Sequence, residues 1–577
     1  MEKEPLIVLS DFSFTYQNSK DSALSNISLT ICPGEVIGIM GAGGAGKSTF
    51  AYALSGLIPD FIPGNYQGIV RIDNRDPMTA PPRNVAETVG LVFQDFESQL
   101  FSSSCELEIA FAMENRGISR TLMQEQIYRI LHQIGLPGYE IRAPSSLSGG
   151  QKQRLVIGAV LALSPEILCL DEPVTDLDPV GKEEIFSLIA SIRRNGNDHQ
   201  SDNKPVTSII IEHETEEMTA VDRLILLENG RIVANGAVQD VMQDISLFRR
   251  LGIMPLPVIE YFHDLSLCLS RVPLTISDAI SLYHENHLTL DTTRYQEIIR
   301  QEKNRSQTYG PEIISLKNVH FGYEEKPVLH DISLTIRSRE CIALIGPNGC
   351  GKTTLSRQFT GLLHPDTGEV TIAGLNTRSH SIHELSRHIG YVFQNPDHQI
   401  FSETVFDEVA YGVRLHGFSS SEVTLRVSEA LAAVGLSGHE SADPFSLPKG
   451  DRQRVAVASV LALRPDIIVM DEPTTGLDYR DQVRMMELIR ELNQKGHTII
   501  IITHAMWVVA RYVHRVIVLK DGQILADDNP RSIFSNEEIL AKAAIKPPQI
   551  TAFSSRLGYP MLSVQEMVSV TFQEEGA

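Results

Sequence analysis

Two glycine-rich segments of this sequence have the residue types and spacing needed to bind a nucleoside triphosphate. Residues 41–48 read GAGGAGKS and residues 346–353 read GPNGCGKT, and both fit the P-loop pattern G-x-x-x-x-G-K-[ST]. The glycines allow successive backbone N–H groups to point at phosphate oxygens, beside a helix N-terminus that also favours anions. The lysine would reach the β- and γ-phosphates. The predicted ATP-binding residues are Gly41, Gly43, Gly44, Ala45, Gly46, Lys47, Ser48 and Thr49 in the first segment, and Gly346, Asn348, Gly349, Cys350, Gly351, Lys352, Thr353 and Thr354 in the second.

Two adjacent carboxylates end an apolar run downstream of each P-loop. The runs read ILCLDE at residues 167–172 and IIVMDE at residues 467–472, and such apolar runs are typical of a strand buried on both faces. The first acid of each pair would hold Mg²⁺ with the P-loop hydroxyl, and the second would be the general base that polarises the attacking water. The predicted metal ligands are Ser48, Thr353, Asp171 and Asp471, and the predicted bases are Glu172 and Glu472. Read alone, two acids at a strand end could cap a helix, but their position after a P-loop favours the catalytic interpretation.

The P-loops belong to a repeat that covers most of the chain. Residues 90–102 (GLVFQDFESQLFS) recur as residues 390–402 (GYVFQNPDHQIFS). The offset is 305 residues at the P-loop lysines (352 − 47) and 300 residues at the aspartates (471 − 171). Such steady spacing indicates that a whole domain was duplicated. The tails of the two halves repeat more faintly, and chance resemblance of two proline-containing helices remains the alternative there.

The pattern of apolar runs, and the glycines that follow them, predict an α/β fold for each half. GEVIGIM and CIALIGP are short apolar runs that lead into the P-loops, and helical segments follow, which is the strand–loop–helix order that a P-loop requires. Parallel strands that alternate with helices give a mostly parallel sheet core. We predict an ATPase domain at residues 1–245 with a small C-terminal extension at 246–291, a polar linker at 292–310, a second ATPase domain at 311–535 and its extension at 536–577.

Composition and charge narrow the classes of function. The 577 residues are 42% hydrophobic and 21% charged, as in ordinary globular proteins. Lys+Arg number 50 against Asp+Glu 72, and the net charge of −22 weighs against a nucleic-acid partner. Six scattered cysteines without a CxxC pair argue against zinc, iron–sulfur and disulfide frameworks. No apolar run reaches the ~20 residues of a membrane-spanning helix and no signal-peptide pattern begins the sequence, so we expect any membrane role to depend on a partner.

A pentapeptide shortly before the first acidic strand links these motifs to a known family. It reads LSGGQ and is similar to the signature of ABC-type ATPases. The resemblance covers nearly the whole chain and implies tandem ABC ATPase domains, each with a helical subdomain that carries the signature, and ATP and Mg²⁺ as cofactors. In this family two domains close head to tail, so that each ATP is held between the P-loop of one domain and the signature of the other. The resemblance thus adds Ser148, Gly149, Gly150 and Gly450 to the ATP-binding residues.

The resemblance assigns further roles to residues that occur at matched places in both halves. One glutamine would sense the γ-phosphate, contribute to the Mg²⁺ site and contact the transport partner. One histidine after an apolar strand would be the catalytic switch, one aspartate would lie in the loop that crosses between the domains, and one tyrosine would stack on adenine. In that order these residues are Gln94 and Gln394, His213 and His504, Asp178 and Asp478, and Tyr16 and Tyr323.

The second signature differs from the first and reads LPKGD. Pro448 has neither the serine hydroxyl nor a backbone N–H to offer the γ-phosphate. Lys449 places a long side chain where glycine permits close approach, although its charge could instead help to bind phosphate. The site of Glu472 would face the intact signature and the site of Glu172 the altered one. We therefore expect two unequal sites, with the Glu472 site dominant.

The segments that follow the two Q-loop glutamines resemble those of energy-coupling-factor (ECF) importer ATPases. Residues 95–102 and 395–402 resemble the Q-N-P-D-x-Q-(L/I)-F segment of that group, and residues 108–111 and 408–411 resemble its E-D-V-A-F-G stretch. This resemblance implies an energising subunit at the cytoplasmic face of the cell membrane, for a vitamin or a transition-metal ion. Its partners would be a transmembrane coupling protein and a substrate-binding membrane component, both on separate chains. The coupling protein would enter a groove beside the Q-loop, for which the candidate lining residues are Phe96, Leu100, Phe101, Ile400 and Phe401, with ordinary core packing as the alternative for each.

Two other kinds of ABC protein share the catalytic motifs. A fused ATPase of a sugar or peptide importer would also have no membrane spans, but it would not predict the glutamine–leucine–phenylalanine segment in both halves. A soluble ABC ATPase that acts on ribosomes or DNA would be expected to have a long charged linker, cysteine-bound clusters or coiled coils, which this sequence does not have. The transported solute and the stoichiometry of a complex are not encoded in these motifs.

Overall fold

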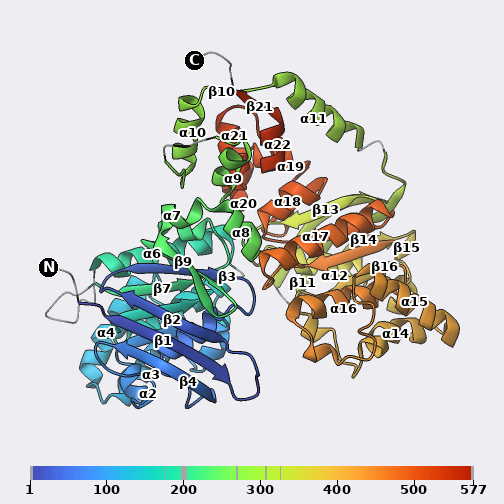
Figure 1. The fold of residues 1–577 in the computed structure, drawn as a ribbon. Helices are drawn as coiled ribbons and strands as arrows, with labels where there is room; N and C mark the ends of the chain where they lie inside the picture. Colours follow the sequence, from blue (N-terminus) through green and yellow to red (C-terminus); the bar gives the residue numbers. More distant parts are fainter. Residues whose placement is uncertain are drawn as a thin grey trace. The chain divides into compact units, whose positions relative to one another are not determined.

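The computed structural model describes residues 4–175, 177–195, 205–267, 269, 271–305, 308–324 and 326–573 (Figure 1). Of the predicted domains, residues 1–3, 176 and 196–204 of the first, 268 and 270 of its extension, 306–307 of the linker, 325 of the second domain and 574–577 of the last extension lie outside the described residues. The chain divides into two compact units, Met1–Ile259 and Glu260–Ala577.

A six-stranded sheet at the centre of the first unit brings the predicted motifs to one edge. The strand order is β5, β6, β7, β3, β8 and β9, and only β9 runs antiparallel to its neighbour. Every residue of β3, β6 and β7 is buried, which accounts for their apolar runs. The strands are β3 (Val36–Gly41), β5 (Val89–Val92), β6 (Ile167–Asp171), β7 (Thr207–Ile211), β8 (Arg223–Glu228) and β9 (Arg231–Ala237). Because parallel strands end at the same edge, the P-loop after β3 and the acids at the end of β6 meet there.

An antiparallel sheet and a set of helices complete the first unit. The sheet has the order β2, β1, β4, with β1 (Ile7–Tyr16), β2 (Leu24–Ile31) and β4 (Gly64–Ile72). Its inner residues pack with α1 and the central strands in one core. The helices are α1 (Lys47–Leu54), α2 (Pro82–Val85), α3 (Cys105–Asn115), α4 (Arg120–Gln133), α5 (Gly149–Leu161), α6 (Pro179–Asn195), α7 (Val238–Met242) and α8 (Ile245–Leu251). The first signature lies at the start of α5.

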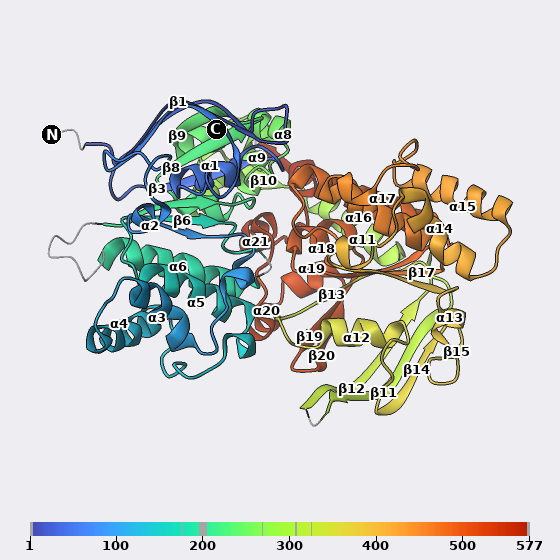
Figure 2. The same ribbon diagram turned by 90° about the horizontal axis from the view of Figure 1, so that it is seen from below.

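The second unit repeats this architecture. Its central sheet has the order β16, β17, β18, β13, β19, β20, again with only the last strand antiparallel to its neighbour. The strands are β13 (Cys341–Ile345), β16 (Ile389–Val392), β17 (Ile467–Asp471), β18 (Thr498–Ile502), β19 (Arg515–Lys520) and β20 (Gln523–Asp528). The antiparallel sheet consists of β11 (Glu312–Tyr323), β12 (Lys326–Arg337), β14 (Thr367–Ile372) and β15 (Leu375–Asn376) (Figure 2). The fold prediction of tandem P-loop α/β domains is confirmed.

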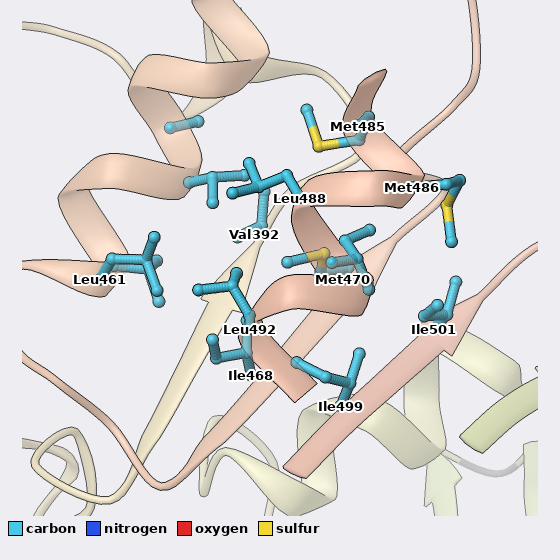
Figure 3. Packing of buried hydrophobic residues seen from close by; sticks show 14 of the residues in the cluster. Val392, Leu461, Ile468, Met470, Met485, Met486, Leu488, Leu492, Ile499 and Ile501 are labelled. Carbon is cyan, nitrogen blue, oxygen red and sulfur yellow. The ribbon is translucent and has the colours of Figure 1, made fainter. Parts of the chain in front are cut away.

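The helices of the second unit follow the same order as those of the first. They are α12 (Lys352–Phe359), α13 (Ile382–Leu385), α14 (Val405–Leu415), α15 (Ser420–Ala433), α16 (Lys449–Leu461), α17 (Tyr479–Gln494), α18 (Met506–Tyr512), α19 (Pro530–Phe534) and α20 (Glu537–Ala543). Figure 3 shows how α17 places Met485, Met486 and Leu488 in the core beside Ile468 and Ile501 of the central strands. The buried apolar face of α17 fixes this helix against the strand that carries the second acid pair.

The two predicted C-terminal extensions share one small body within the second unit. It contains α9 (Pro257–Asp264), which begins before the unit boundary, α10 (Ile276–Glu285), β10 (Leu288–Leu290), α11 (Thr292–Arg305), α21 (Gln549–Arg556), α22 (Val564–Val570) and β21 (Thr571–Gln573). Strand β10 pairs antiparallel with β21. The Tyr261 hydroxyl donates to Thr571 Oγ1 at 3.0 Å, and the Tyr261 ring lies 5.6 Å from that of Phe553. Within this body Tyr261 and Phe262 of α9 pack against Phe553 of α21, whereas Ala543, Ile545 and Leu562 of the last predicted extension belong to the core of the second ATPase domain. The predicted linker is largely helical, since α11 occupies most of it.

Phe553→Ala is expected to destabilise this body by about 3–5 kcal/mol, because the Phe553 ring is fully buried and its removal leaves a cavity. Hydrogen exchange followed by mass spectrometry should show lost protection in peptides from α10 and α21. Phe572→Ala is the matched control, since Phe572 is exposed and its loss should leave protection unchanged. Equal exchange in both variants would contradict the packing described.

Candidate functional site

In each P-loop the lysine side chain donates hydrogen bonds to carbonyl oxygens of the same loop. Gly46 precedes α1 with a φ of 99°, and a Cβ at this position would lie 2.5 Å from the Ala23 carbonyl oxygen, so glycine is required. The Lys47 ammonium donates to the carbonyl oxygens of Gly41 and Ala42 at 2.9 and 3.0 Å. The buried ammonium is thus positioned over the loop whose N–H groups would face phosphate.

The second P-loop has the same geometry. Gly351 has a φ of 104°, and Lys352 donates to the carbonyl oxygens of Gly346 and Pro347 at 2.8 and 2.9 Å. The two loops that the sequence predicted to be equivalent therefore share both the left-handed glycine and the lysine contacts.

The Mg²⁺ role predicted for Asp171 fits its surroundings. Both carboxylate oxygens are buried and have no hydrogen bond of ordinary geometry within the described part of the chain. Burial raises the pKa of Asp171 to about 6, and the nearby Ser48 hydroxyl partly offsets this effect. A divalent cation bound by the Asp171 carboxylate and the Ser48 hydroxyl would compensate the buried negative charge of Asp171.

Glu172 is held as an ionised carboxylate at the end of β6. Its Oε2 accepts from Gln94 Nε2 at 2.7 Å and from Thr175 Oγ1 at 3.2 Å, and its Oε1 lies 2.7 Å from His213 Nε2. Although burial acts to raise it, the hydrogen bond and charge of His213 hold the pKa of Glu172 below its usual value. Its φ of 51° lies in the left-handed region, a strained conformation that recurs at functional sites. The structure thus brings together the predicted base, glutamine and histidine of the first repeat.

The second acid pair has the same backbone but different contacts. Glu472 has a φ of 47°, and its Oε1 lies 3.4 Å from His504 Nε2. Asp471 accepts a hydrogen bond of 2.8 Å from the Tyr391 hydroxyl, and burial raises the pKa of Asp471. Leu91 occupies the place of Tyr391 in the first repeat, so this contact exists in the second repeat alone. The predicted Gln394 is exposed.

The two signatures begin their helices differently. Ser148 and Gln151 form a capping box at the start of α5, with hydrogen bonds of 3.1 and 3.4 Å. Pro448 at the start of α16 makes no side-chain cap, as the sequence predicts. Gly149 and Gly150, predicted to bind ATP, are the first residues of α5 and are half-buried.

The lysine of the altered signature is accommodated within its own domain. Its Nζ lies over Gly476, where a Cβ would be only 2.1 Å from that nitrogen. The equivalent residue of the first repeat is Asp176, which lies outside the described residues. Gly450 is buried, and a Cβ there would lie 2.8 Å from Asp481 Oδ2. The Lys449 amino group therefore packs against the loop of the second repeat that contains Gly476.

The predicted tyrosines have different surroundings in the two repeats, whereas the two loop aspartates make the same contact. The Tyr16 hydroxyl is 2.7 Å from Thr49 Oγ1 in α1, and its ring is half-buried, whereas Tyr323 is exposed. Asp178 and Asp478 each accept a backbone N–H at 2.9 Å, and Asp478 thereby caps α17. Capping is thus one role of these aspartates that the sequence comparison did not indicate.

Two residues in each repeat, a glutamine and a glutamate of the motifs compared above, hold the segment after the Q-loop glutamine, a role that the sequence did not predict. The Gln99 carboxamide accepts from Phe93 N at 2.9 Å and donates to Leu91 O at 3.2 Å, and Glu108 Oε2 accepts from the N–H groups of Phe101 and Ser102 at 3.1 and 2.8 Å. In the second repeat Gln399 likewise accepts from Phe393 N, but its amide donates to Ala456 O and the Ser459 hydroxyl, both at 3.0 Å. Glu408 makes the same contacts as Glu108, and both glutamates are buried. Their recurrence in both halves was the signal that could have identified them.

A cavity of about 450 Å³ lies beside the first Q-loop segment. Leu100 and Phe101 line it as predicted, together with Phe111, whose ring meets that of Phe101 edge-on at 4.7 Å. Phe96 is not among its lining residues. In the second repeat Phe401 is exposed, but Ile400 is buried in the core and cannot line a groove, because its side chain packs inward with α14 and α16.

No helix among the described residues is long and apolar enough to cross a membrane.

Comparisons with known proteins identify the family of this chain. A family model described as ABC transporter matches residues 24–175 and 329–475. A protein of Caldanaerobacter subterraneus subsp. tengcongensis, provisionally named an ABC transporter ATP-binding protein, is 48% identical over 98% of each chain. A protein of Streptococcus mutans with the same provisional name is 34% identical over 96% of each chain. Among solved structures, cbiO1 from Clostridium perfringens, described as part of the ABC transporter complex cbiONQ, is 32% identical and covers 42% of this chain and 99% of its own, with a TM-score of 0.38.

Proposed function

This chain belongs to the ABC transporter family of ATP-hydrolysing proteins, and from that premise we propose that it is the energy-coupling ATPase subunit of an ECF-type importer. The solute would be a vitamin or a transition-metal ion. The transmembrane coupling protein and the substrate-binding membrane component would be separate chains, and the ATPase would act at the cytoplasmic face of the cell membrane.

The observation that supports this proposal is the repeated segment after each Q-loop glutamine. Buried Glu108 and Glu408 accept backbone hydrogen bonds that hold Phe101 and Phe401 in place, and both phenylalanine rings are more than 60% exposed. Each ring contacts a second exposed aromatic residue edge-on, at 4.7 Å in the first repeat and 4.8 Å in the second. An aromatic pair that the fold exposes to solvent suits contact with a partner helix, and in the first repeat a cavity lies beside it.

The catalytic residues explain how the site would act on ATP. When bound, Mg²⁺ would neutralise charge on the β- and γ-phosphates, and Ser48, Asp171 and their counterparts Thr353 and Asp471 would hold it. Lys47 would exchange its carbonyl contacts for phosphate oxygens.

The carboxylate that follows each aspartate Mg²⁺ ligand would accept the proton of the attacking water. Glu172 is kept ionised by His213 and is oriented by Gln94, so it can accept a proton from the attacking water. Because Gln94 also begins the segment that leads to Phe101, a change at the γ-phosphate would be transmitted to the aromatic pair. ATP binding would close the two domains and hydrolysis would reopen them, and this motion would reorient the coupling protein.

Phe101→Ser combined with Phe401→Ser is expected to reduce the amount of integral membrane protein that co-purifies with the chain from detergent-solubilised membranes by at least roughly tenfold. The reason is that the exposed rings would supply the apolar centre of the contact. Intact-protein mass spectrometry of the co-purified proteins provides the measurement.

Ile141→Ser combined with Leu425→Ser is the matched control, because both residues are exposed apolar side chains outside the groove positions. ATP binding and the unfolding temperature would establish that each variant is folded. Retention of the same membrane proteins by the groove variant would contradict the proposal, as would a wild-type chain that retains ribosomes or DNA instead.

A further inference from the structure

Two side-chain hydroxyl groups lie between the predicted Mg²⁺ ligands of the second repeat. The Tyr391 hydroxyl, on β16, donates to Asp471 Oδ2 at 2.8 Å and lies 3.3 Å from the Ser356 hydroxyl on α12. The Ser356 hydroxyl in turn lies 2.9 Å from the Thr353 carbonyl oxygen. Asp471 at the end of β17 and Thr353 of the P-loop are thereby connected through two side chains.

The hydrogens of these groups follow from their chemistry. An ionised carboxylate can only accept, so Tyr391 must donate to Asp471, and each hydroxyl has one hydrogen to give. The Tyr391 oxygen can then accept from Ser356, whose single hydrogen is shared between this oxygen and the Thr353 carbonyl. Burial, and then the charge of Asp471, raise the pKa of Tyr391, so the phenol stays protonated and remains a donor.

The first repeat has neither hydroxyl. The offset of 305 residues at the P-loops places Ala51 at the position of Ser356 (356 − 305), and the offset of 300 residues at the acids places Leu91 at that of Tyr391 (391 − 300). Ala51 and Leu91 pack in the core of the first repeat, and the Tyr391 side chain packs against the equivalent core of the second. Because the first repeat adopts the same fold without them, the two hydroxyls are not required for packing.

Charged groups of α12 also act on Asp471. Burial raises the pKa of Asp471, and the charges of Lys352 and Arg357 partly offset this effect. Tyr52 takes the place of Arg357 in the first repeat (357 − 305). These charges alter the energy of the carboxylate, but only a directed hydrogen bond fixes its orientation. A test of the hydroxyl must therefore leave both charges in place.

We propose that Tyr391, supported by Ser356, is a positioning residue that holds the Asp471 carboxylate in the orientation in which it binds Mg²⁺ together with the Thr353 hydroxyl. Partners that hydrogen-bond to a ligating carboxylate orient it, and their loss typically costs about 10–100-fold in metal affinity. The two nucleotide sites then differ at their Mg²⁺ ligands as well as in their signatures. This inference rests on the ATPase site that the family shares and not on the importer type, so a failed importer assignment leaves it standing.

Tyr391→Phe in the full-length chain removes the hydroxyl and keeps the ring in the core. In a Lys47→Ala background, which disables the first P-loop, binding of a fluorescent non-hydrolysable ATP analogue reports the second site. The ratio of the affinity with Mg²⁺ to the affinity in EDTA is expected to fall by roughly tenfold, while the affinity in EDTA changes by less than about twofold. Ser356→Ala should lower the same ratio by a smaller factor.

Tyr512→Phe is the matched control, because it removes another hydroxyl-to-carboxylate hydrogen bond of the same domain, 2.9 Å long and made to Glu487. It should leave the ratio unchanged, and its unfolding temperature measures a purely structural loss. A ratio that Tyr391→Phe leaves unchanged or raises would overturn the proposal. Equal losses of affinity with Mg²⁺ and in EDTA, or a ratio that Tyr512→Phe lowers as far, would also overturn it, since either result indicates a structural role. An unchanged ratio in Ser356→Ala would overturn the part assigned to Ser356.

Discussion

Glu472→Gln is expected to abolish most steady-state ATP hydrolysis, whereas Glu172→Gln leaves most of it intact. Loss of a general base costs about 10²–10⁴-fold in rate, but only at the site that carries it. If the two domains close head to tail, the Glu472 site is completed by the intact signature, and the Glu172 site by Pro448 and Lys449. Each hydrogen bond to a charged phosphate that is lost at the altered signature costs ~1.5–3 kcal/mol, roughly tenfold to a hundredfold in rate.

Phosphate release from the purified full-length chain provides this measurement. Nucleotide binding is the control, because Gln keeps the size of Glu and both variants should still bind ATP. The structure gives each of the two glutamates the same left-handed backbone and a histidine partner, so both carboxylates are placed to act as bases. Equal losses of activity in the two variants would contradict the assignment of unequal sites.

Exchange of the two signatures is expected to move the activity from one site to the other. Ser148→Pro with Gly149→Lys should lower hydrolysis nearly as far as Glu472→Gln, because the active site would lose the serine hydroxyl and the close approach that glycine permits. The reverse change, Pro448→Ser with Lys449→Gly and Asp451→Gln, recreates the residues of the Ser148–Gln151 capping box at the start of α16 and should raise turnover at the Glu172 site.

The decisive comparison is the restored second signature in the background of Glu472→Gln. This variant should regain hydrolysis by at least roughly tenfold over Glu472→Gln alone. Lys449→Ala is the control for simple loss of the lysine, since it removes the side chain that covers Gly476 without supplying a serine. If Glu472→Gln stays inactive with a restored signature, the altered signature is not what limits the first site.

Local sequence was sufficient to predict the backbone arrangement around the P-loops and the acid pairs. A P-loop requires a strand, a glycine turn and a helix in sequence order, and the left-handed Gly46 and Gly351 occupy the places that this order demands. The acids at the ends of β6 and β17 could be placed because parallel strands end at one edge. The contact of Glu172 with His213 then follows, since β6 and β7 are neighbours.

Contacts between residues far apart in sequence could not be predicted in the same way. Nothing local to Tyr391 indicates its hydrogen bond to Asp471, which lies 80 residues away. The pairing of β10 with β21 joins the two extensions across most of the second unit and depends on tertiary packing alone. Ile400 was expected in a groove because an apolar residue after a loop fits either the core or a surface, and only the packing against α14 and α16 decides between them.

Whether this chain energises an ECF-type importer is best decided by identifying, by mass, the integral membrane proteins that co-purify with the wild-type chain from detergent-solubilised native membranes. We expect two kinds of integral protein, a coupling protein that contacts Phe101 and Phe401 and a substrate-binding component, and their retention should fall when Phe101 and Phe401 are replaced by serine. A chain that is recovered with ribosomal or DNA-bound proteins, or with no integral membrane protein, would contradict the proposed function.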